Sequence, residues 1–518
     1  MIKEEWPNRM LHDFLENNIQ NKLNILYVIQ ARKYTSIKEL GELLHLSYSG
    51  VNSLVSEINK DLCGYALLRK ESNSLVLDFQ QDSDISILVH RICRRSAMLH
   101  CLKFFLTNDA QQPFVSFYDR EFLSQPTAYR IRNSCREYLV SIGLGLQQNK
   151  VVGDEYRIRF LIALLYYKYG VDCGYFDSDS IYAARQFILE TNQSISMNYL
   201  NQISMEHGYF ECLFVLLWKR VEYQVKIPQF NHFGKLKEVF VYNRLKKLLN
   251  TTLTSQLHIQ FSEDDLDYLY LIYLCTNNSM FADKWKPEDV EQNQSIIFAD
   301  NEFDALVKKM QGVFGTDACT TRPFKATLVN FYKKCILELY CLIPDEHFYL
   351  YSQRNETTQI IYNLLSDIIN NWGKSIGFQF TLDKSHLFYL SLQIEFILYQ
   401  RLVPVPIYIL SDLNAELEVM TLYLQNHFSS RSTSITPLLI TLQNIEFLCQ
   451  QKHCIIVASD KFIKYFSIPK LLEHNTFIPV SVEINPRDIQ MINDTFTRYK
   501  KIYFLNYLSS LSYNPDKI

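Results

Sequence analysis

Glycine and proline are scarce in this chain. Only 14 of each occur among 518 residues, too few for the many turns of an all-β architecture, so a mainly helical fold is expected. No apolar run approaches the roughly 18 residues of a membrane span. The start, MIKEEWPNRM, carries two glutamates and no leader-like apolar core. We therefore expect a cytoplasmic protein with no membrane partner.

The motifs of common enzymes and metal sites are also absent. The sequence contains no GxxxxGK[ST] phosphate loop, no GxSxG elbow and no HExxH pair. Its 12 cysteines form no CxxC pair, so we expect reduced thiols that pack as small apolar groups. Cys449, His453 and Cys454 lie close together but lack a fourth ligand at usual spacing. The sequence predicts a non-enzyme without cofactor or metal.

The chain is too long for one core, and a domain size of roughly 100 to 200 residues predicts three to five units. Its net charge is only −3, but residues 84–170 hold 12 Lys and Arg against 7 Asp and Glu. That segment therefore carries +5, and the rest of the chain carries −8. A local positive field of this kind is suited to the phosphates of nucleic acid.

A first helix-turn-helix is predicted between Thr35 and Leu62. Leu40, Leu43 and Leu44 form one apolar helix face, and small Gly41 suits a close helix approach. A second helix begins near Ser47, with an apolar stripe from Val51 to Ile58. Its open face would enter a DNA groove with Ser49, Asn52 and Ser53. ALLRKESNSLVLDF follows as a two-stranded wing; the alternative is an ordinary helical hairpin.

A second pattern of this kind, richer in arginine, lies between Phe114 and Phe160. Ser124 and Pro126 suit a helix start, and the inward stripe comprises Ala128, Ile131, Cys135, Tyr138 and Leu139. The outward side is basic and is our preferred recognition surface, since Arg bonds guanine or phosphate bidentately. Its DNA-binding candidates are Thr127, Tyr129, Arg130, Arg132, Asn133 and Arg136.

A wing follows this helix too. LGLQQNKVV predicts two short strands that carry Lys150 toward the duplex backbone, with Arg157 and Arg159 just beyond. The alternative is a solvated basic helix face. The segment ISILVHRICRRSAMLHCLKFFL, between the two modules, is predicted to be one long apolar helix that joins or dimerises them.

These residues resemble the RofA-like stand-alone regulators of Gram-positive cocci, which are relatives of the Mga-type virulence regulators. Besides the second helix-turn-helix, the resemblance includes NKVVGDEYRIRFLIALLYYKYG, WKRVEYQVKIPQ and DLDYLYLIYLCTNNS, in that order. It implies binding to promoters of surface, adhesin and toxin genes. We expect a homodimer on double-stranded DNA, because half-site spacing on a duplex is matched by protein symmetry.

The resemblance also implies a domain layout. A first winged helix-turn-helix would occupy 1–80, and a linker helix with a second, Mga-type one 84–170. Two helical phosphotransferase-system regulation (PRD) domains would occupy 171–290 and 295–403, consistent with long amphipathic stretches such as QIIYNLLSDIINNWGKS. An α/β domain similar to a phosphotransferase IIB component would occupy 404–510.

Regulators of this sort are phosphorylated on histidine by the phosphotransferase system, which implies its phosphocarrier protein as a partner. Here the expected positions hold Ile272 or Tyr273, and Gln393. The nearby candidate acceptors are His207, His258, His347 and His386. The bundles are otherwise expected to serve as dimerisation modules.

From Pro404 short apolar runs alternate with helical segments, which predicts a βαβ domain with a parallel sheet. A working IIB component would carry a nucleophilic cysteine after the first strand, where Ser411-Asp412-Leu413 stands instead. Cys454 falls inside a predicted strand and is expected to be buried. We expect an inactive IIB-like fold that makes dimer contacts.

Two other functions use related parts. An RNA-binding antiterminator would need a small β-rich module at its start, whereas this one is helical. The other is a phosphotransferase component or signalling scaffold that does not bind nucleic acid, and the missing loop cysteine counts against its catalytic form.

Overall fold

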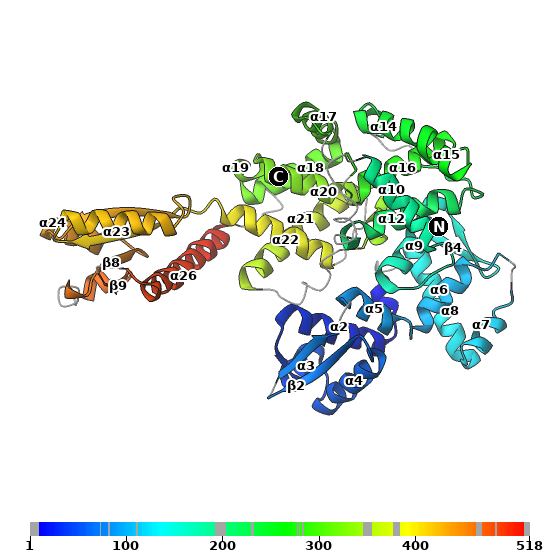
Figure 1. Cartoon of the computed structure of the whole chain (residues 1–518), viewed down its shortest axis with the longest axis horizontal. Helices are drawn as coiled ribbons and strands as arrows, with labels where there is room; N and C mark the ends of the chain where they lie inside the picture. The colour runs from blue at the N-terminus through cyan, green and yellow to red at the C-terminus, as the bar shows by residue number, and fades with distance from the viewer. Residues whose placement is uncertain are drawn as a thin grey trace. The chain divides into compact units, whose positions relative to one another are not determined.

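The computed structural model (Figure 1) is mainly helical and multidomain. It describes residues 10–72, 74–80, 83–109, 112–191, 204–228, 233–276, 278, 280–281, 284–344, 355–376, 384–462, 469–481 and 484–511, with the backbone alone at 204–207. The described residues within 1–308, 325–354 and 366–390 form one compact unit, the N-terminal unit. Those within 309–324, 355–365 and 391–518 form another.

The first module has helices at the predicted positions. Its elements are α1 (Leu11–Phe14), α2 (Asn17–Arg32), β1 (Thr35–Ser36), α3 (Ile37–Leu44), α4 (Tyr48–Asp61), β2 (Ala66–Glu71) and β3 (Ser74–Phe79). Ser36 and Glu39 form a reciprocal capping box at the start of α3. A Cβ on Gly41 would lie 2.8 Å from the Leu46 carbonyl oxygen, so the turn before α4 requires glycine there. The predicted wing is an antiparallel hairpin of β2 and β3, and β1 pairs with β3.

The second module comprises α5 (Ile85–Cys93), α6 (Ala97–Leu106), α7 (Val115–Arg120), α8 (Gln125–Ser141), β4 (Leu144–Gln147), β5 (Lys150–Gly153) and α9 (Glu155–Tyr169). The segment from Ile85 to Leu106 was predicted to be one long helix. This prediction was wrong, because the segment forms two helices, α5 and α6, with a break between them. Ser96 caps α6 by accepting the Leu99 N–H. The Glu16 carboxylate then accepts the Ser96 hydroxyl and the Met98 N–H, which fixes the break.

Helices continue through the middle of the chain, as predicted. They are α10 (Ser178–Thr191), α12 (Ser204–Lys219), α13 (Phe233–Leu236), α14 (Phe240–Leu248), α15 (Thr254–Leu257), α16 (Glu263–Cys275), α17 (Pro287–Phe298), α18 (Asn301–Phe314), α19 (Thr316–Cys319), α20 (Arg322–Cys335), α21 (Glu356–Ser375) and α22 (Lys384–Tyr399). A π-helical turn (Leu249–Leu253) joins α14 to α15, and a 3-10 segment (Ile336–Cys341) follows α20. Helix α12 packs against α9, α10 and α16. Its buried side chains are almost all apolar.

The C-terminal part contains a small parallel sheet, as the alternating texture predicted. Its elements are β6 (Val405–Ser411), α23 (Asn414–His427), β7 (Thr433–Leu439), α24 (Leu442–Gln450), β8 (Ile455–Ser459), α25 (Pro469–Leu472), β9 (Thr476–Val480) and α26 (Pro486–Ser510). The strand order is β7-β6-β8-β9, and all pairs are parallel.

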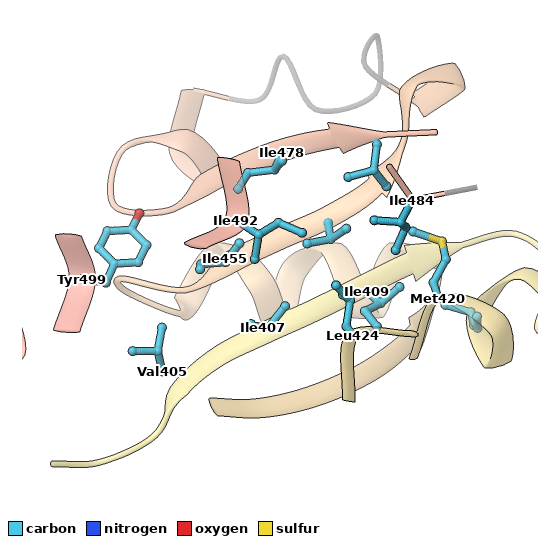
Figure 2. Close-up of a cluster of buried hydrophobic side chains, with 13 residues drawn as sticks. Val405, Ile407, Ile409, Met420, Leu424, Ile455, Ile478, Ile484, Ile492 and Tyr499 are labelled. Atoms are coloured by element: carbon cyan, nitrogen blue, oxygen red, sulfur yellow. The ribbon is translucent and has the colours of Figure 1, made fainter. Parts of the chain in front are cut away.

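Apolar side chains cover both faces of this sheet. Figure 2 shows Ile407 and Ile409 of β6 packed with Met420 and Leu424 of α23 on one face, where Ile492 of α26 joins them. Leu410, Ile456 and Leu448 build the core of the opposite face. A sheet covered on both sides explains why its strands read as continuous apolar runs.

Most of the thiols are buried as predicted, but Cys63 is exposed. Cys454 is fully buried, its Sγ lies 3.1 Å from the Asn475 Oδ1, and burial raises the pKa of its thiol to about 12. Among the described residues no group of three or more His, Cys, Asp or Glu could hold a metal ion. Within the same residues, the search for a helix long and apolar enough to cross a membrane found none.

Gly170 ends α9 in the left-handed conformation, with φ of 66°. A Cβ there would lie 2.5 Å from the His90 side chain, whose Nε2 is 2.8 Å from the Tyr167 carbonyl oxygen. We expect Gly170→Ala to destabilise the N-terminal unit by about 1–3 kcal/mol more than Gly174→Ala. Gly174 has φ of 89° but nothing within 4 Å of its Cβ position. Gly174→Ala therefore measures the cost of alanine at positive φ without a steric clash. Equal thermal unfolding of the two variants would contradict this packing.

Candidate DNA-binding interface

Helix α8 holds its apolar side inside the second module. Ala128, Cys135, Tyr138 and Leu139 are buried, and the helix packs on α6. Ser124 is the N-cap residue, as predicted, and Pro126 lies in the first turn. The Ser124 hydroxyl, however, donates to Thr127 Oγ1 at 2.9 Å, and it accepts no backbone N–H.

The opposite side of α8 is open and cationic. Arg130, Asn133 and Arg136 are exposed, and Tyr129 keeps 42% of its surface. Within the described residues, no carboxylate forms an ion pair with an α8 arginine. The partly buried Arg132 lies instead over the rings of Phe114 and Tyr129, at 5.4 and 5.8 Å from their centroids. The exposed guanidinium groups of α8 are therefore available to an external anion.

The wing after α8 is a tight hairpin. Gln148 and Asn149 both have positive φ, 46° and 62°, as a type I′ turn requires. The buried Asn108 donates its amide to the Asn149 carbonyl oxygen at 3.0 Å and so anchors the turn. Lys150 Nζ lies 2.5 Å from Asp109 Oδ1, and this contact holds the pKa of Asp109 below its usual range. Lys150 is thus already paired within the protein.

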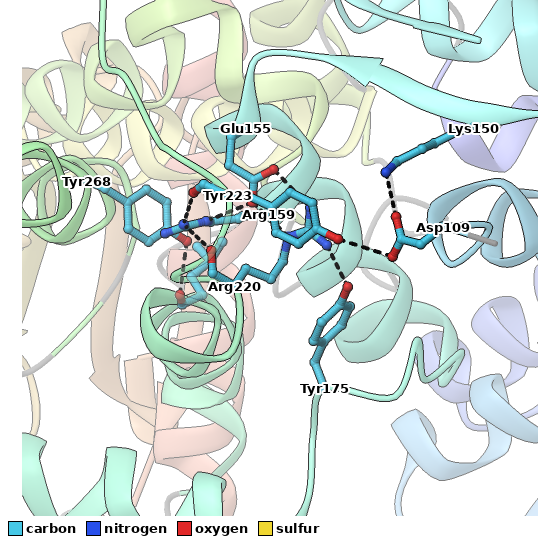
Figure 3. Close-up of polar contacts among 9 residues, drawn as sticks. Asp109, Lys150, Glu155, Arg159, Tyr175, Arg220, Tyr223 and Tyr268 are labelled. Carbon is cyan, nitrogen blue, oxygen red and sulfur yellow. Dashed lines mark hydrogen bonds and ion pairs between the residues drawn. The ribbon is translucent and has the colours of Figure 1, made fainter. Parts of the chain in front are cut away.

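Contacts of Asp109 lead from the wing into the helical bundle (Figure 3). Its second oxygen accepts the Tyr223 hydroxyl at 3.1 Å. The Arg220 guanidinium lies 4.0 Å from the centroid of the Tyr223 ring. Arg220 and Tyr223 follow helix α12, so the residue that holds the wing lysine also contacts the bundle.

Two buried arginines share one carboxylate at the start of α9, as Figure 3 shows. Arg220 donates to both oxygens of Glu155, at 2.7 and 2.9 Å, and a further N–H to the Tyr175 hydroxyl. Arg159 donates to Glu155 at 3.0 Å and to the Arg220 carbonyl oxygen at 2.9 Å. Arg159 is fully buried and lies 4.7 Å from the Tyr268 ring centroid. This network fastens α9 to α12 and α16.

Arg157 and Arg159 therefore do not continue the basic surface beyond the wing. Arg157 is 8% exposed and donates to the carbonyl oxygens of Ile142 and Leu337, at 3.1 and 2.7 Å. The guanidinium groups of Arg157 and Arg159 therefore form hydrogen bonds within the protein and do not face solvent. Sequence periodicity missed this because α9 is apolar nearly all round, so no polar face predicts where its arginines point.

On the first module, Ser49, Asn52 and Ser53 are exposed along α4, as expected. Asn52 donates its amide to the Tyr48 carbonyl oxygen at 2.9 Å, and the Ser49 hydroxyl lies 3.1 Å from that of Ser47. These groups are polar and uncharged, so the surface of α4 attracts phosphate less strongly than that of α8.

The candidate phosphate acceptors have different surroundings. His258 is exposed and ends α15 in the left-handed conformation. His386 is 5% exposed, and its Nε2 lies 3.0 Å from the Ile343 carbonyl oxygen. The side chain of His207 and the whole of His347 lie outside the described residues.

The loop after β6 holds acidic groups where a IIB component would bind phosphate. The Ser411 hydroxyl donates to Glu416 Oε2 at 2.6 Å. Lys461 Nζ contacts both Asp412 and Glu416 at 3.1 Å, which lowers the pKa of Asp412. Because one ammonium faces two carboxylates, the loop repels a phosphate group.

Comparison with known families gives two matches. Residues 81–166 match the Mga helix-turn-helix domain, and residues 183–350 match the M protein trans-acting positive regulator (MGA) PRD domain. Both matches support the Mga-type family of PRD-containing transcriptional regulators. The Mga-type helix-turn-helix match includes α8 and its wing, while the PRD match covers most of the first predicted bundle and ends within the second. Both families are regulatory rather than enzymatic. No curated protein matches the chain.

Sequence reasoning missed Asp109, Tyr223 and Glu155. Asp109 lies 114 residues from Tyr223, and Glu155 lies 65 residues from Arg220. No local pattern carries pairings at such separations. The only sequence signal was the cluster of arginines and tyrosines around these positions.

Replacement of Glu155 tests the shared carboxylate. We expect Glu155→Ala to destabilise the N-terminal unit by about 3–5 kcal/mol, because two buried guanidinium groups lose their counter-charge. The control is Asp304→Asn, which removes an exposed i,i+4 pair with Lys308 and should cost about 0.5 kcal/mol or less. Thermal unfolding followed by near-UV circular dichroism measures both, and equal effects would refute the assigned role of Glu155.

Proposed function

We propose that this chain is a promoter-binding regulator that inserts α8 into the major groove of double-stranded DNA. The observation that carries the proposal is the open face of α8, where Arg130, Asn133 and Arg136 are exposed without a partner among the described residues while the reverse face is buried. A helix held in this way can enter a groove about 12 Å wide, as recognition helices do.

The side chains of α8 suit different contacts. Arg130 and Arg136 can bond guanine or phosphate bidentately, and Asn133 can pair with adenine. Thr127 and Tyr129, near the start of the helix, suit phosphate oxygens. Arg132 contributes charge from a partly buried position over Phe114, so we assign it to the DNA backbone rather than to a base.

The first module would make a second contact. The exposed Ser49, Asn52 and Ser53 of α4 can bond base edges or phosphates, and we propose that this module is a winged helix-turn-helix as well. Two DNA-binding modules in one chain raise the affinity, because binding of the first increases the effective concentration of the second. The weaker charge of α4 makes α8 the dominant contact.

The finer identity follows the resemblance in the sequence. We propose a RofA-like regulator that acts in the cytoplasm as a homodimer at promoters of surface and virulence genes. The PRD region would comprise two bundles, and the C-terminal sheet a IIB-like domain that supports dimer contacts. If the phosphotransferase system modifies the chain, the exposed His258 suits its phosphocarrier protein better than the buried His386 does.

The open arginines of α8 can be tested directly. Arg130→Ala with Arg136→Ala should weaken promoter binding about tenfold or more, because charge-assisted contacts are lost. The log–log salt slope should fall by about 0.9 for each phosphate contact removed. Fluorescence anisotropy across a salt series measures both quantities.

The matched control removes two positive charges elsewhere. Lys246→Ala with Lys247→Ala changes exposed residues of α14 by the same net charge. It should leave binding nearly unchanged. The assignment of α8 fails if the two double variants lose affinity equally.

Asp109→Asn tests whether the wing lysine is held back from DNA. Release of Lys150 should strengthen binding and steepen the salt slope by about 0.9, the value of one added phosphate contact. Asp119→Asn makes the same charge change at an exposed position on nearby α7 and serves as the control. Weaker binding by Asp109→Asn, or an equal gain from Asp119→Asn, would show that Asp109 does not restrain Lys150.

A further inference from the structure

A polar pocket lies among three helices of the PRD region. The end of α16, one face of α17 and one face of α20 line an open pocket of about 310 Å³. The lining residues of each helix recur three or four positions apart and so share one face. They include Val290, Asn293 and Gln294 on α17, and Ala326, Asn330 and Lys333 on α20. The pocket is therefore built from regular elements, which can hold ligand-binding groups in fixed positions.

Among the described residues, the charged side chains that line this pocket are all positive. They are Lys333 and Lys334, and no described aspartate or glutamate is in the lining. In the described part of the chain neither lysine forms an ion pair with a carboxylate. Burial lowers the pKa of Lys333, because desolvation disfavours an ammonium without a counter-ion. An anion placed beside the two lysines would supply the missing charge.

A nearby carboxylate does not fill this role. Asp300 lines a small adjoining cavity of about 30 Å³ that Lys333 also borders. Its Oδ1 accepts the N–H groups of Glu302 and Phe303 at 2.8 and 3.3 Å, at the start of α18. That bonding holds Asp300 as a helix cap, and Asp300 does not line the larger pocket.

The rest of the lining suits hydroxyl groups. The side chains of Asn293, Gln294 and Asn330 form no hydrogen bond with any described residue, so their donors and acceptors are open. Trp285 donates its indole N–H to the Tyr273 hydroxyl at 3.2 Å, which sets two aromatic rings in the wall. Amides beside an aromatic ring are the usual partners of a hydroxyl-rich ring with apolar C–H faces.

We propose that this pocket binds a phosphorylated sugar as an effector of the regulator. The phosphate would lie at Lys333 and Lys334, and the sugar hydroxyls at the amides of Asn293, Gln294 and Asn330. A volume near the lower limit of small-molecule sites suits one monosaccharide unit. This site is separate from the proposed DNA contact of α8, and its occupancy stabilises the bundle by mass action.

Isothermal titration of the full chain with glucose 6-phosphate tests the pocket. Saturable binding is expected, and Lys333→Met should weaken it at least about tenfold by removing a charged hydrogen-bond donor. Lys308→Met, at an exposed lysine of α18, should leave it unchanged. No binding by the wild type, or equal binding by Lys333→Met, would overturn the proposal.

Two further ligands separate the parts of the site. Unphosphorylated glucose should bind far more weakly than glucose 6-phosphate, because it has no charge for the lysines. Inorganic phosphate should also bind more weakly, because it leaves the amides unused. Phosphate binding as tight as that of glucose 6-phosphate would refute the sugar assignment.

Thermal unfolding distinguishes a ligand site from a structural lysine. Without ligand, Lys333→Met should unfold at a higher temperature than the wild type, because a desolvated charge without a partner is removed. Glucose 6-phosphate should raise the unfolding temperature of the wild type and not that of the variant. A variant that unfolds at a lower temperature and still responds to the ligand would contradict the proposal.

Discussion

Glu155, the first residue of α9, lies between two buried guanidinium groups, those of Arg159 and Arg220. Charges in such surroundings are tolerated only when paired and hydrogen-bonded, so the chain must bring these three residues together to fold. Arg159 comes from the last helix of the helix-turn-helix module, and Arg220 directly follows α12. Their shared carboxylate therefore fixes where the helix-turn-helix module ends and the helical bundle begins.

The wing depends on the same junction. Tyr223 is held over Arg220 and donates to Asp109, which in turn pairs with Lys150. A continuous set of contacts thus runs from a buried ion pair in the bundle to the lysine of the wing. These contacts connect the end of α12 in the bundle with the wing that follows α8. The pocket at Lys333 lies in the same compact unit, on α16, α17 and α20.

Local patterns in the sequence were enough to predict the helices, the wings and the parallel sheet. The stripe from Ala128 to Leu139 has the period of a helix with one buried face, and the apolar runs after Pro404 have the length of strands. The same patterns failed where residues distant in the sequence determine a helix boundary or the burial of a side chain. The break between α5 and α6 depends on Glu16, which lies 80 residues from Ser96. Arg159 looked like surface charge because, besides the nearby Glu155, its partners are the distant carbonyl oxygens of Arg220 and Tyr223.

In the candidate site, too, the features set by local sequence could be predicted and those set by distant residues could not. Exposure of Arg130, Asn133 and Arg136 could be predicted, because the buried stripe of α8 determines its opposite face. The pairing of Lys150 could not, because Asp109 and Tyr223 come from two other segments. The lysines of α20 gave no functional signal, since only the fold shows which side chains line a pocket with them.

Site-specific photo-crosslinking tests the central claim that α8 lies in the groove. A benzophenone amino acid at position 133, on the open face of α8, should crosslink to promoter DNA, and the same group at position 247, on α14, should not. The account predicts that the crosslinked nucleotides lie within the protected promoter segment. Crosslinks from position 52 with none from position 133 would contradict it and transfer DNA recognition to α4.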